Sequence, residues 1–339
     1  MRISIFASIW AQNLWDELIL KNEIKLLEKK YWEDTKFSVF TYDKKNIFYK
    51  KENVKYYEFF PIGIKNPKNI IKNKLNFIVF IFITLMSDLI VIWWWWIIYD
   101  NENQLTKSPL KIWMFRTFIF RMFMKKIEFF RLWLNIKDKN NYKKVKFIFK
   151  KANYISVRDN YSFELLNELW INSTIEKDPV FYDKGSYITN KSLIWVINST
   201  DLTTNKLLSF DFNWITVWLA LRSWYLVEKS NLSMRMEEGK IREIINYITS
   251  NGWKIILLPH SFHKNDILAN DFLFLNKFLH KNVSIESSME DVYNVYKNKK
   301  IDICFSMRLH SIILSHVYEI PFLWISYSKK TDEILKTLK

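Results

Sequence analysis

The sequence predicts an α/β protein made of two Rossmann-like domains with a central cleft. Short apolar segments alternate along the chain with segments of helical periodicity, which is typical of parallel sheets covered by helices. The 339 residues, 49% of them hydrophobic, are enough for two domains of ordinary size. In such architectures ligands bind beyond the carboxyl ends of the strands. Functional residues are therefore expected in loops that directly follow strands.

The strands and helices are predicted from these apolar patterns. The strands are residues 2–7, 37–42, 89–92, 154–157, 193–198, 214–221, 254–258, 301–305 and 322–327. The helices between them include 15–31, 76–86, 161–169, 235–250 and 308–318. The polar segment 182–192, which holds Gly185, is the best linker. It divides the chain into domains 1–183 and 184–339.

Glycine and tryptophan occur in unusual numbers. The chain has 4 glycines and 16 tryptophans, whereas average usage would give roughly two dozen glycines. Several tryptophans occupy positions typical of glycine, such as Trp15 before a helix, Trp170 after one, Trp253 beside a turn, and Trp324, which is expected to interrupt a strand. We hypothesise that most of them are glycines encoded by UGA. The alternative is an aromatic-rich core of true tryptophans.

Four consecutive tryptophans follow the strand 89–92. Read as glycines, Trp93, Trp94, Trp95 and Trp96 form a loop whose backbone N–H groups can approach a substrate. Read as tryptophans, they would crowd or plug that pocket.

The net charge of +16 is compatible with an anionic partner. No arginine-rich tract or zinc-finger, RNP or basic-zipper pattern is present, so no nucleic-acid partner is predicted. Much of the charge is interpreted as a solvated lysine surface, with anionic substrates or lipid-linked sugars at an inner membrane leaflet as compatible ligands.

Cysteine usage and the amino terminus indicate a cytoplasmic protein. The single cysteine, Cys304, excludes a disulfide framework and is predicted to be a buried structural thiol. The first residues, MRISIFASI, predict a strand and not a signal peptide.

Two segments bear on membrane association. Residues 75–99 have the length of a spanning helix, but Ser87 and Asp88 divide them, which favours a helix, a strand and a loop. Residues 112–133 are predicted to be one amphipathic helix. It is either a surface helix that touches the membrane or an ordinary domain helix.

Five motifs in order resemble the polysaccharide pyruvyl transferase family over about residues 3–330: NLWDELIL read as N-L-G-D-E, DLIVIWWWWIIYD read as D-L-I-V-I-G-G-G-G-I-I-Y-D, ISVRDNYSFELLNELW, KDPVF and MRLHSIILSHVYEIPFLWISYSKK. The resemblance implies a fold similar to the GT-B glycosyltransferases, with acceptor and donor sides in the first and second domains. It implies transfer of pyruvate from phosphoenolpyruvate to a sugar of a cell-surface polymer or its lipid-linked precursor, as a ketal, without an organic cofactor.

The resemblance also implies site residues. Arg158 and Arg308 follow strands and would bind the carboxylate and phosphate of the donor, for which arginine has the suitable geometry. The alternative for Arg158 is a pair with Asp159 or a neighbouring acid. His310 would supply a proton or bind the phosphate. Lys330 would add a second cation, although Lys329 could take that place.

The remaining predicted site residues concern the acceptor. Asn13, Asp16 and Asp159 are expected to contact substrate; Asp16 could instead cap the first helix. His260 and His263 do not form a metal motif and are expected to be surface or acceptor-side residues. Two other functions stay open: a glycosyltransferase using a nucleotide sugar, and a non-catalytic membrane-associated protein built around residues 75–133.

Overall fold

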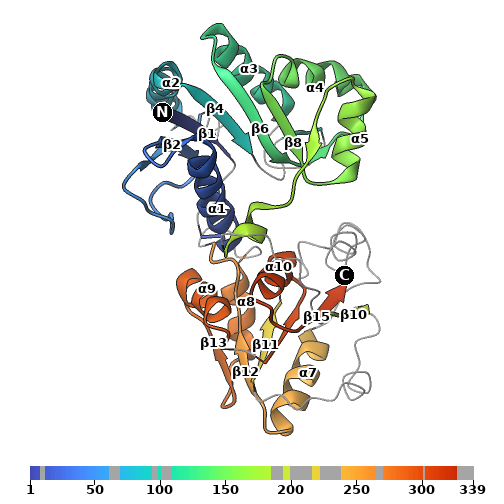
Figure 1. Ribbon diagram of the computed structural model, residues 1–339. Helices are drawn as coiled ribbons and strands as arrows, with labels where there is room; N and C mark the ends of the chain where they lie inside the picture. The colour runs from blue at the N-terminus through green and yellow to red at the C-terminus, as the bar shows by residue number, and fades with distance from the viewer. Residues whose placement is uncertain are drawn as a thin grey trace. The chain divides into compact units, whose positions relative to one another are not determined.

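The structure is a computed structural model. It describes residues 1–7, 12–60, 69–93, 98–100, 109–184, 194–198, 216–221, 238–263, 270–300 and 302–326. The chain forms two compact units. Unit 1 contains Met1–Ala11 and Ile19–Pro179, and unit 2 contains Gln12–Leu18 and Val180–Lys339. In both units parallel strands form a sheet against which helices pack (Figure 1).

Unit 1 is built on a seven-stranded sheet in the order β3-β2-β1-β4-β6-β8-β9. Its strands are β1 (Arg2–Phe6), β2 (Lys36–Thr41), β3 (Val54–Glu58), β4 (Leu89–Trp93), β6 (Lys126–Leu132), β8 (Tyr154–Val157) and β9 (Thr174–Ile175). Short strands β5 (Ile98–Tyr99) and β7 (Leu134–Asn135) pair separately. The helices are α1 (Leu14–Tyr31), α2 (Asn69–Met86), α3 (Pro109–Met122), α4 (Tyr142–Phe149) and α5 (Asn160–Glu168). The strand order reverses between β1 and β4, where α/β sheets place their ligands.

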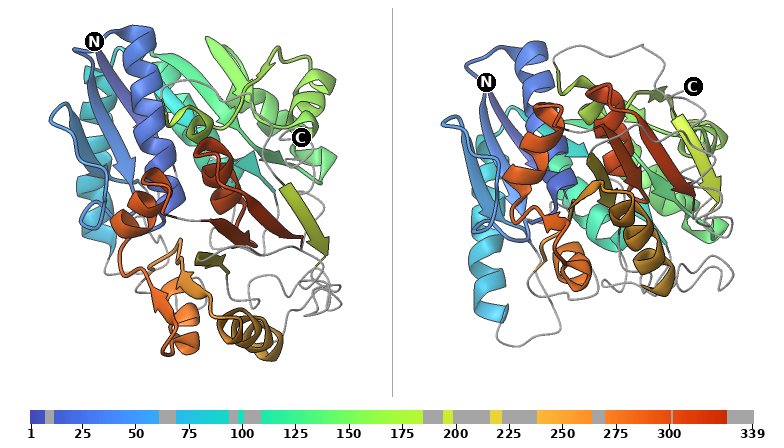
Figure 2. Two further views of the ribbon diagram at one scale, coloured as in Figure 1. Left: turned by 60° about the horizontal axis from the view of Figure 1, so that its bottom comes forward. Right: turned by 90° about the horizontal axis from the view of Figure 1, so that it is seen from below.

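Unit 2 is built on a six-stranded sheet in the order β10-β15-β14-β11-β12-β13. Its strands are β10 (Ile194–Asn198), β11 (Thr216–Ala220), β12 (Lys254–Leu257), β13 (Val283–Ile285), β14 (Ile303–Ser306) and β15 (Phe322–Ser326). The helices are α7 (Glu238–Ser250), α8 (Asp271–Leu275), α9 (Met289–Lys297) and α10 (Leu309–Val317). All pairs of strands in this sheet run parallel (Figure 2).

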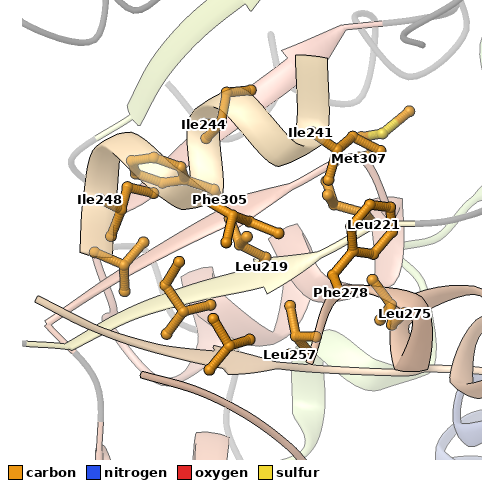
Figure 3. Packing of buried hydrophobic residues seen from close by; sticks show 14 of the residues in the cluster. Leu219, Leu221, Ile241, Ile244, Ile248, Leu257, Leu275, Phe278, Phe305 and Met307 are labelled. Atoms are coloured by element: carbon orange, nitrogen blue, oxygen red, sulfur yellow. The ribbon is translucent and has the colours of Figure 1, made fainter. Parts of the chain in front are cut away.

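One hydrophobic cluster of unit 2 lies between its sheet and α7. Ile241, Ile244 and Ile248 recur at helical spacing on α7 and pack over Leu219 and Phe305 of the central strands (Figure 3). This spacing gives α7 one apolar face. Burial of that face fixes the strands whose carboxyl ends carry the candidate site.

The predicted α/β class is confirmed, and each of the nine predicted strands corresponds to a strand of the structure. The prediction missed β3, β6 and β13 and the two-residue strands β5, β7 and β9. The predicted helix 112–133 is wrong, because α3 ends at Met122 and β6 occupies 126–132. Met124 (φ 51°) turns the chain between them. Every residue of β6 except Lys126 is buried or partly buried, as is usual in a parallel sheet covered by helices, and its apolar run resembled a continuing helix.

Within residues 75–99, α2 ends at Met86 and β4 begins at Leu89, so the predicted helix and strand are confirmed. Trp93, predicted as the first residue of the loop, belongs to β4, and residues 94–97 lie outside the described residues. No helix among the described residues is sufficiently long and apolar to cross a membrane. Residues 185–192 of the predicted linker lie outside the described residues.

The tryptophans occupy two kinds of position. Trp324 is completely buried inside β15 and pairs with Ser306, so the expectation that it interrupts a strand is wrong. Trp170 and Trp32 are instead 91% and 78% exposed and follow α5 and α1 with φ values of 58° and 90°. This left-handed conformation after a helix is the one glycine favours, as predicted for Trp170.

Candidate functional site

The candidate site of unit 2 is built where β14 meets α10. Arg308 follows β14 and is the N-cap residue of α10, with its backbone N–H donating to Ser306 Oγ at 2.9 Å. Its guanidinium pairs with the buried carboxylate of Asp271, which begins α8. The Arg308 side chain is 11% exposed. A nearly buried cation thus lies beside the amino terminus of a helix, an arrangement that attracts anions.

His310 lies in the first turn of α10 and stacks on Trp15. The two ring centroids are 4.1 Å apart and the rings are nearly parallel, at 17°. Trp15 lies in the first turn of α1, in the short segment 12–18 that belongs to unit 2. The structure therefore brings together the N-L-W-D and M-R-L-H motifs, which are almost 300 residues apart in the chain.

Backbone contacts hold this segment in place. Leu14 N–H donates to His260 O at 3.0 Å, Phe262 N–H donates to Gln12 O at 2.8 Å, and Asn13 forms a β-bridge with Ser261. The residues directly before Trp15 are thereby held to residues 260–262 by main-chain contacts.

His260, expected at the surface or the acceptor side, is 1% exposed, so the surface interpretation is wrong. Its Nε2 lies 3.1 Å from Tyr296 Oη, which in turn lies 2.6 Å from Ser311 Oγ. Burial, with a smaller contribution from Arg308, lowers the pKa of His260 to about 3. This histidine is therefore neutral at physiological pH, in contact with the site and unsuited to act as an acid. His263 is partly exposed.

The predicted acceptor residues at the start of α1 have structural partners. Asn13 Oδ1 accepts a hydrogen bond from Trp15 N–H at 3.1 Å, which caps the helix. Asp16 is 3% exposed and lies within the first turn. The interpretation of Asp16 as the cap is therefore wrong, because Asn13 has that place. Cys304 is buried in β14, as predicted, and burial raises the pKa of its thiol.

A second candidate site lies in unit 1 at the carboxyl ends of β6 and β8. Arg158 pairs with Asp178, and Arg131 binds Glu23 and Glu176 at 2.8 Å each. Burial lowers the pKa of Arg158 to about 10, which leaves it charged at neutral pH. Burial also raises the pKa of Glu23, against the opposing effect of Arg131. A small pocket is lined by Ile19, Glu23, Trp93, Phe130, Arg131, Arg158 and Pro179.

Arg158 thus pairs with a neighbouring acid, but this acid is Asp178 and not Asp159. Asp159 caps α5, accepting hydrogen bonds from Ser162 N–H and Ser162 Oγ at 2.8 and 2.6 Å. Trp93 ends β4 and is 2% exposed in the wall of the pocket.

The remaining predicted site residues, Trp94, Trp95, Trp96, Lys329 and Lys330, lie outside the described residues. Within the described part of the chain, no cluster of three or more histidine, cysteine, aspartate or glutamate side chains could hold a metal ion. Sequence reasoning missed Asp271, Arg131, Glu23 and the role of Trp15 at the site. Asp271 carries no local signal, because it lies 37 residues from the arginine with which it pairs.

The fold defines a class of protein. Solved structures with the same fold include the UDP-GlcNAc 2-epimerase of Methanocaldococcus jannaschii, at 12% identity and a TM-score of 0.54, covering 99% of this chain and 87% of that one. The putative enzyme of the same kind from Listeria monocytogenes has 11% identity, a TM-score of 0.53 and coverages of 99% and 81%. The UDP-GlcNAc 2-epimerase of Neisseria meningitidis bound to UDP-GlcNAc has 11% identity and a TM-score of 0.52, covering 99% of this chain and 85% of that one. These likenesses identify a GT-B-type fold.

The family is more specific. The model of the polysaccharide pyruvyl transferase family matches residues 16–329, so the chain belongs to that family. The matched range contains Arg158, Arg308 and His310. No curated protein matches the chain in sequence.

Proposed function

We propose that this protein transfers pyruvate from phosphoenolpyruvate to two hydroxyl groups of one sugar, forming a cyclic ketal on a cell-surface polysaccharide or its lipid-linked precursor. Family membership supports the pyruvyl transfer. The donor and the product are inferred from the chemistry available at the site. The observation that carries the proposal is the arrangement of Arg308 and His310 at the amino terminus of α10.

Arg308 suits the anionic donor. Phosphoenolpyruvate carries a phosphate and a carboxylate, and a guanidinium can bind either in a bidentate manner. The pair with Asp271 orients the guanidinium. The first N–H groups of a helix have no acceptor within that helix, so those of α10 can add further donors for the same anion. We assign the donor side to unit 2 for this reason.

His310 is assigned to proton transfer. The reaction protonates the methylene carbon, C3, and leaves positive character at C2, which one sugar hydroxyl attacks. The C2–O bond to phosphate then breaks, and a second hydroxyl closes the ring. The two sugar hydroxyl groups each lose a proton. These two protons balance the proton added to C3 and the proton that leaves with phosphate. A histidine whose ring is held in a fixed plane can donate the proton that is added to C3.

Arg158 and the pocket of unit 1 provide a second cationic region. We propose that this unit carries the acceptor side. The predicted contact of Arg158 with the donor is tested by Arg158→Ala, which should weaken binding of phosphoenolpyruvate. The free, buried thiol of Cys304 is consistent with a reducing compartment, and we place the reaction in the cytoplasm. No organic cofactor is needed for this chemistry.

The test is phosphate release from phosphoenolpyruvate in the presence of candidate acceptors, including lipid-linked amino sugars and galactosides. Two versions of the chain are compared, one as written and one with glycine at the suspected tryptophans. Arg308→Ala and His310→Ala should each lower the rate at least about 100-fold. Arg242→Ala and His280→Ala, at exposed positions of the same unit, are the matched controls.

A glycosyltransferase using a nucleotide sugar has the same fold and is the alternative function. Binding of uridine or guanosine diphosphate, with no binding of phosphoenolpyruvate, would favour it. Full activity of either Arg308→Ala or His310→Ala would remove that residue from the proposed site.

A further inference from the structure

Helix α2 of unit 1 presents an apolar stripe to solvent. Its exposed side chains recur at intervals of four and three residues, the spacing of one helix face. They are Ile71 (74% exposed), Leu75 (61%), Ile78 (63%), Phe82 (59%) and Leu85 (48%). The opposite face is also apolar, with Phe80 buried against Phe6 of β1. An ordinary surface helix places polar residues on its outer face, so α2 departs from that pattern along its whole length.

Helix α3 continues the same surface. Phe115, Phe118 and Met122 are 42%, 52% and 52% exposed at positions i, i+3 and i+7, and Met124 beyond the helix is 90% exposed. The two helices are neighbours on one face of the sheet, because Phe80 and Phe120 both contact Phe6 and lie 5.7 Å from each other. Lys125 Nζ also donates to Leu85 O at 2.8 Å. We call the two exposed stripes together the α2–α3 surface.

The charged residues of α2 and α3 themselves are all of one sign. Neither helix contains an aspartate or a glutamate. Lys74 and Lys111 are exposed on the helices, and Lys126 is exposed just beyond α3. Lys72 is also exposed and is paired with Glu58 at 2.9 Å. Many exposed apolar side chains on two neighbouring helices mark an interaction site, and the lysines on the same helices indicate an anionic partner.

Two other partners, a second copy of the chain and the interior of a membrane, fit the α2–α3 surface less well than the surface of an anionic bilayer. A second copy bound through the same surface would bring the lysines of both copies together, because such an interface is symmetric. As described, neither helix is sufficiently long and apolar to cross a membrane. A surface that is apolar at its centre and basic around it instead matches the boundary between headgroups and acyl chains of an anionic bilayer.

We propose that the α2–α3 surface docks the protein on an anionic lipid bilayer. The exposed side chains of Ile78, Phe82 and Phe118 enter the boundary between headgroups and acyl chains, and Lys74 and Lys111 contact lipid phosphates. This inference goes beyond the proposed reaction and does not depend on it. If the acceptor is lipid-linked, docking would also concentrate the enzyme at its substrate.

The experiment is co-sedimentation of the full chain with vesicles of phosphatidylcholine and phosphatidylglycerol at a ratio of about 3:1. The double variant Ile78→Glu/Phe82→Glu should bind at least roughly tenfold more weakly, because it removes apolar insertion and adds negative charge. Phe118→Glu/Met122→Glu should act in the same direction from the other helix. Leu273→Glu/Leu279→Glu changes two exposed apolar residues of unit 2 (45% and 43%) and should bind like the parent chain.

The contribution of the lysines to vesicle binding is tested separately. Lys74→Gln/Lys111→Gln should weaken binding to the anionic vesicles by roughly fivefold for each lysine. The parent chain should bind more weakly to vesicles of phosphatidylcholine alone. It should also bind the anionic vesicles more weakly in about 0.5 M salt, because salt screens the charges. Equal binding to neutral vesicles would contradict the proposed lipid charge.

The proposal is overturned if the parent chain does not bind anionic vesicles, or if the two glutamate variants bind as well as it does. It is also overturned if the chain is a dimer that Ile78→Glu/Phe82→Glu dissociates and that does not bind vesicles. Phosphate release with a soluble acceptor should be the same in the parent chain and in both glutamate variants. Failure of the proposed reaction would thus appear in that assay alone, and failure of docking in the vesicle assay alone.

Discussion

The indole of Trp15 covers one face of the His310 imidazole, with 4.1 Å between the ring centroids. Trp15 is 2% exposed, so its side chain fills the space next to the proposed proton donor. If residue 15 is glycine in the translated protein, that space is available to a substrate. The stack is therefore informative about both the site and the recoding hypothesis.

We predict that Trp15→Gly raises the rate of phosphate release from phosphoenolpyruvate. The reason is steric, because removal of the indole opens one face of His310. The measurement is the rate with a fixed acceptor, together with a thermal melt to show that the variant is folded. Trp218→Gly, which removes an equally buried tryptophan from β11, is the control and should not raise the rate.

Trp15→Gly with a lower rate and an unchanged melt would contradict the idea that substrate occupies this space. Trp15 would then be a genuine part of the site that orients His310.

Trp32→Gly and Trp170→Gly should each stabilise the chain by about 1 kcal/mol, because a residue with a Cβ atom is strained in the left-handed region and glycine is not. Both side chains are mostly exposed, so little packing is lost. Thermal unfolding should show a rise of roughly 2 °C or more for each change.

Trp113→Gly, in the buried interior of α3, is the matched control for these two changes and should destabilise the chain. The codons provide an independent check of recoding. UGG at positions 32 and 170 would mean that these tryptophans are genuine.

Asp178→Ala and Asp159→Ala should differ in their effect on stability. Asp178 is the ion-pair partner of the nearly buried Arg158, so its removal leaves a charge without its partner and should cost about 3 kcal/mol. Asp159 caps α5, and its removal should cost about 1 kcal/mol. Urea unfolding of the two variants measures both values. Equal losses would mean that Asp178 is not the dominant partner of Arg158.

His260 should make the chain less stable in mild acid. Its folded pKa of about 3 lies below the unfolded value of 6.5, so between these values the unfolded state binds a proton that the folded state does not. The free energy of unfolding therefore increases with pH in this window and, below pH 6.5, falls by about 1.4 kcal/mol for each unit of acidification.

His260→Gln should reduce this slope between pH 6.5 and 4, as measured by urea unfolding at several pH values. His280→Gln, at an exposed position in the same unit, is the control and should leave the slope unchanged. An unchanged slope in His260→Gln would show that this histidine is protonated in the folded state.

The sequence alone was sufficient for the α/β class and for nine of the strands in the two sheets, because apolar periodicity is a local property of the chain. It also indicated the left-handed position at Trp170, since the end of a helix is visible in local sequence. It failed at β6, where a strand covered on both faces has the apolar content of a buried helix. Length and periodicity could not separate the two.

Tertiary structure decided what surrounds the proposed site residues. The pairs Arg308 with Asp271, Arg158 with Asp178 and Trp15 with His310 join segments from 20 to almost 300 residues apart. Only the order of strands in the sheets brings them together, and no local pattern encodes that order. The same reason explains the α2–α3 surface: the sequence shows that the helices are apolar, and packing determines which apolar side chains remain in contact with solvent.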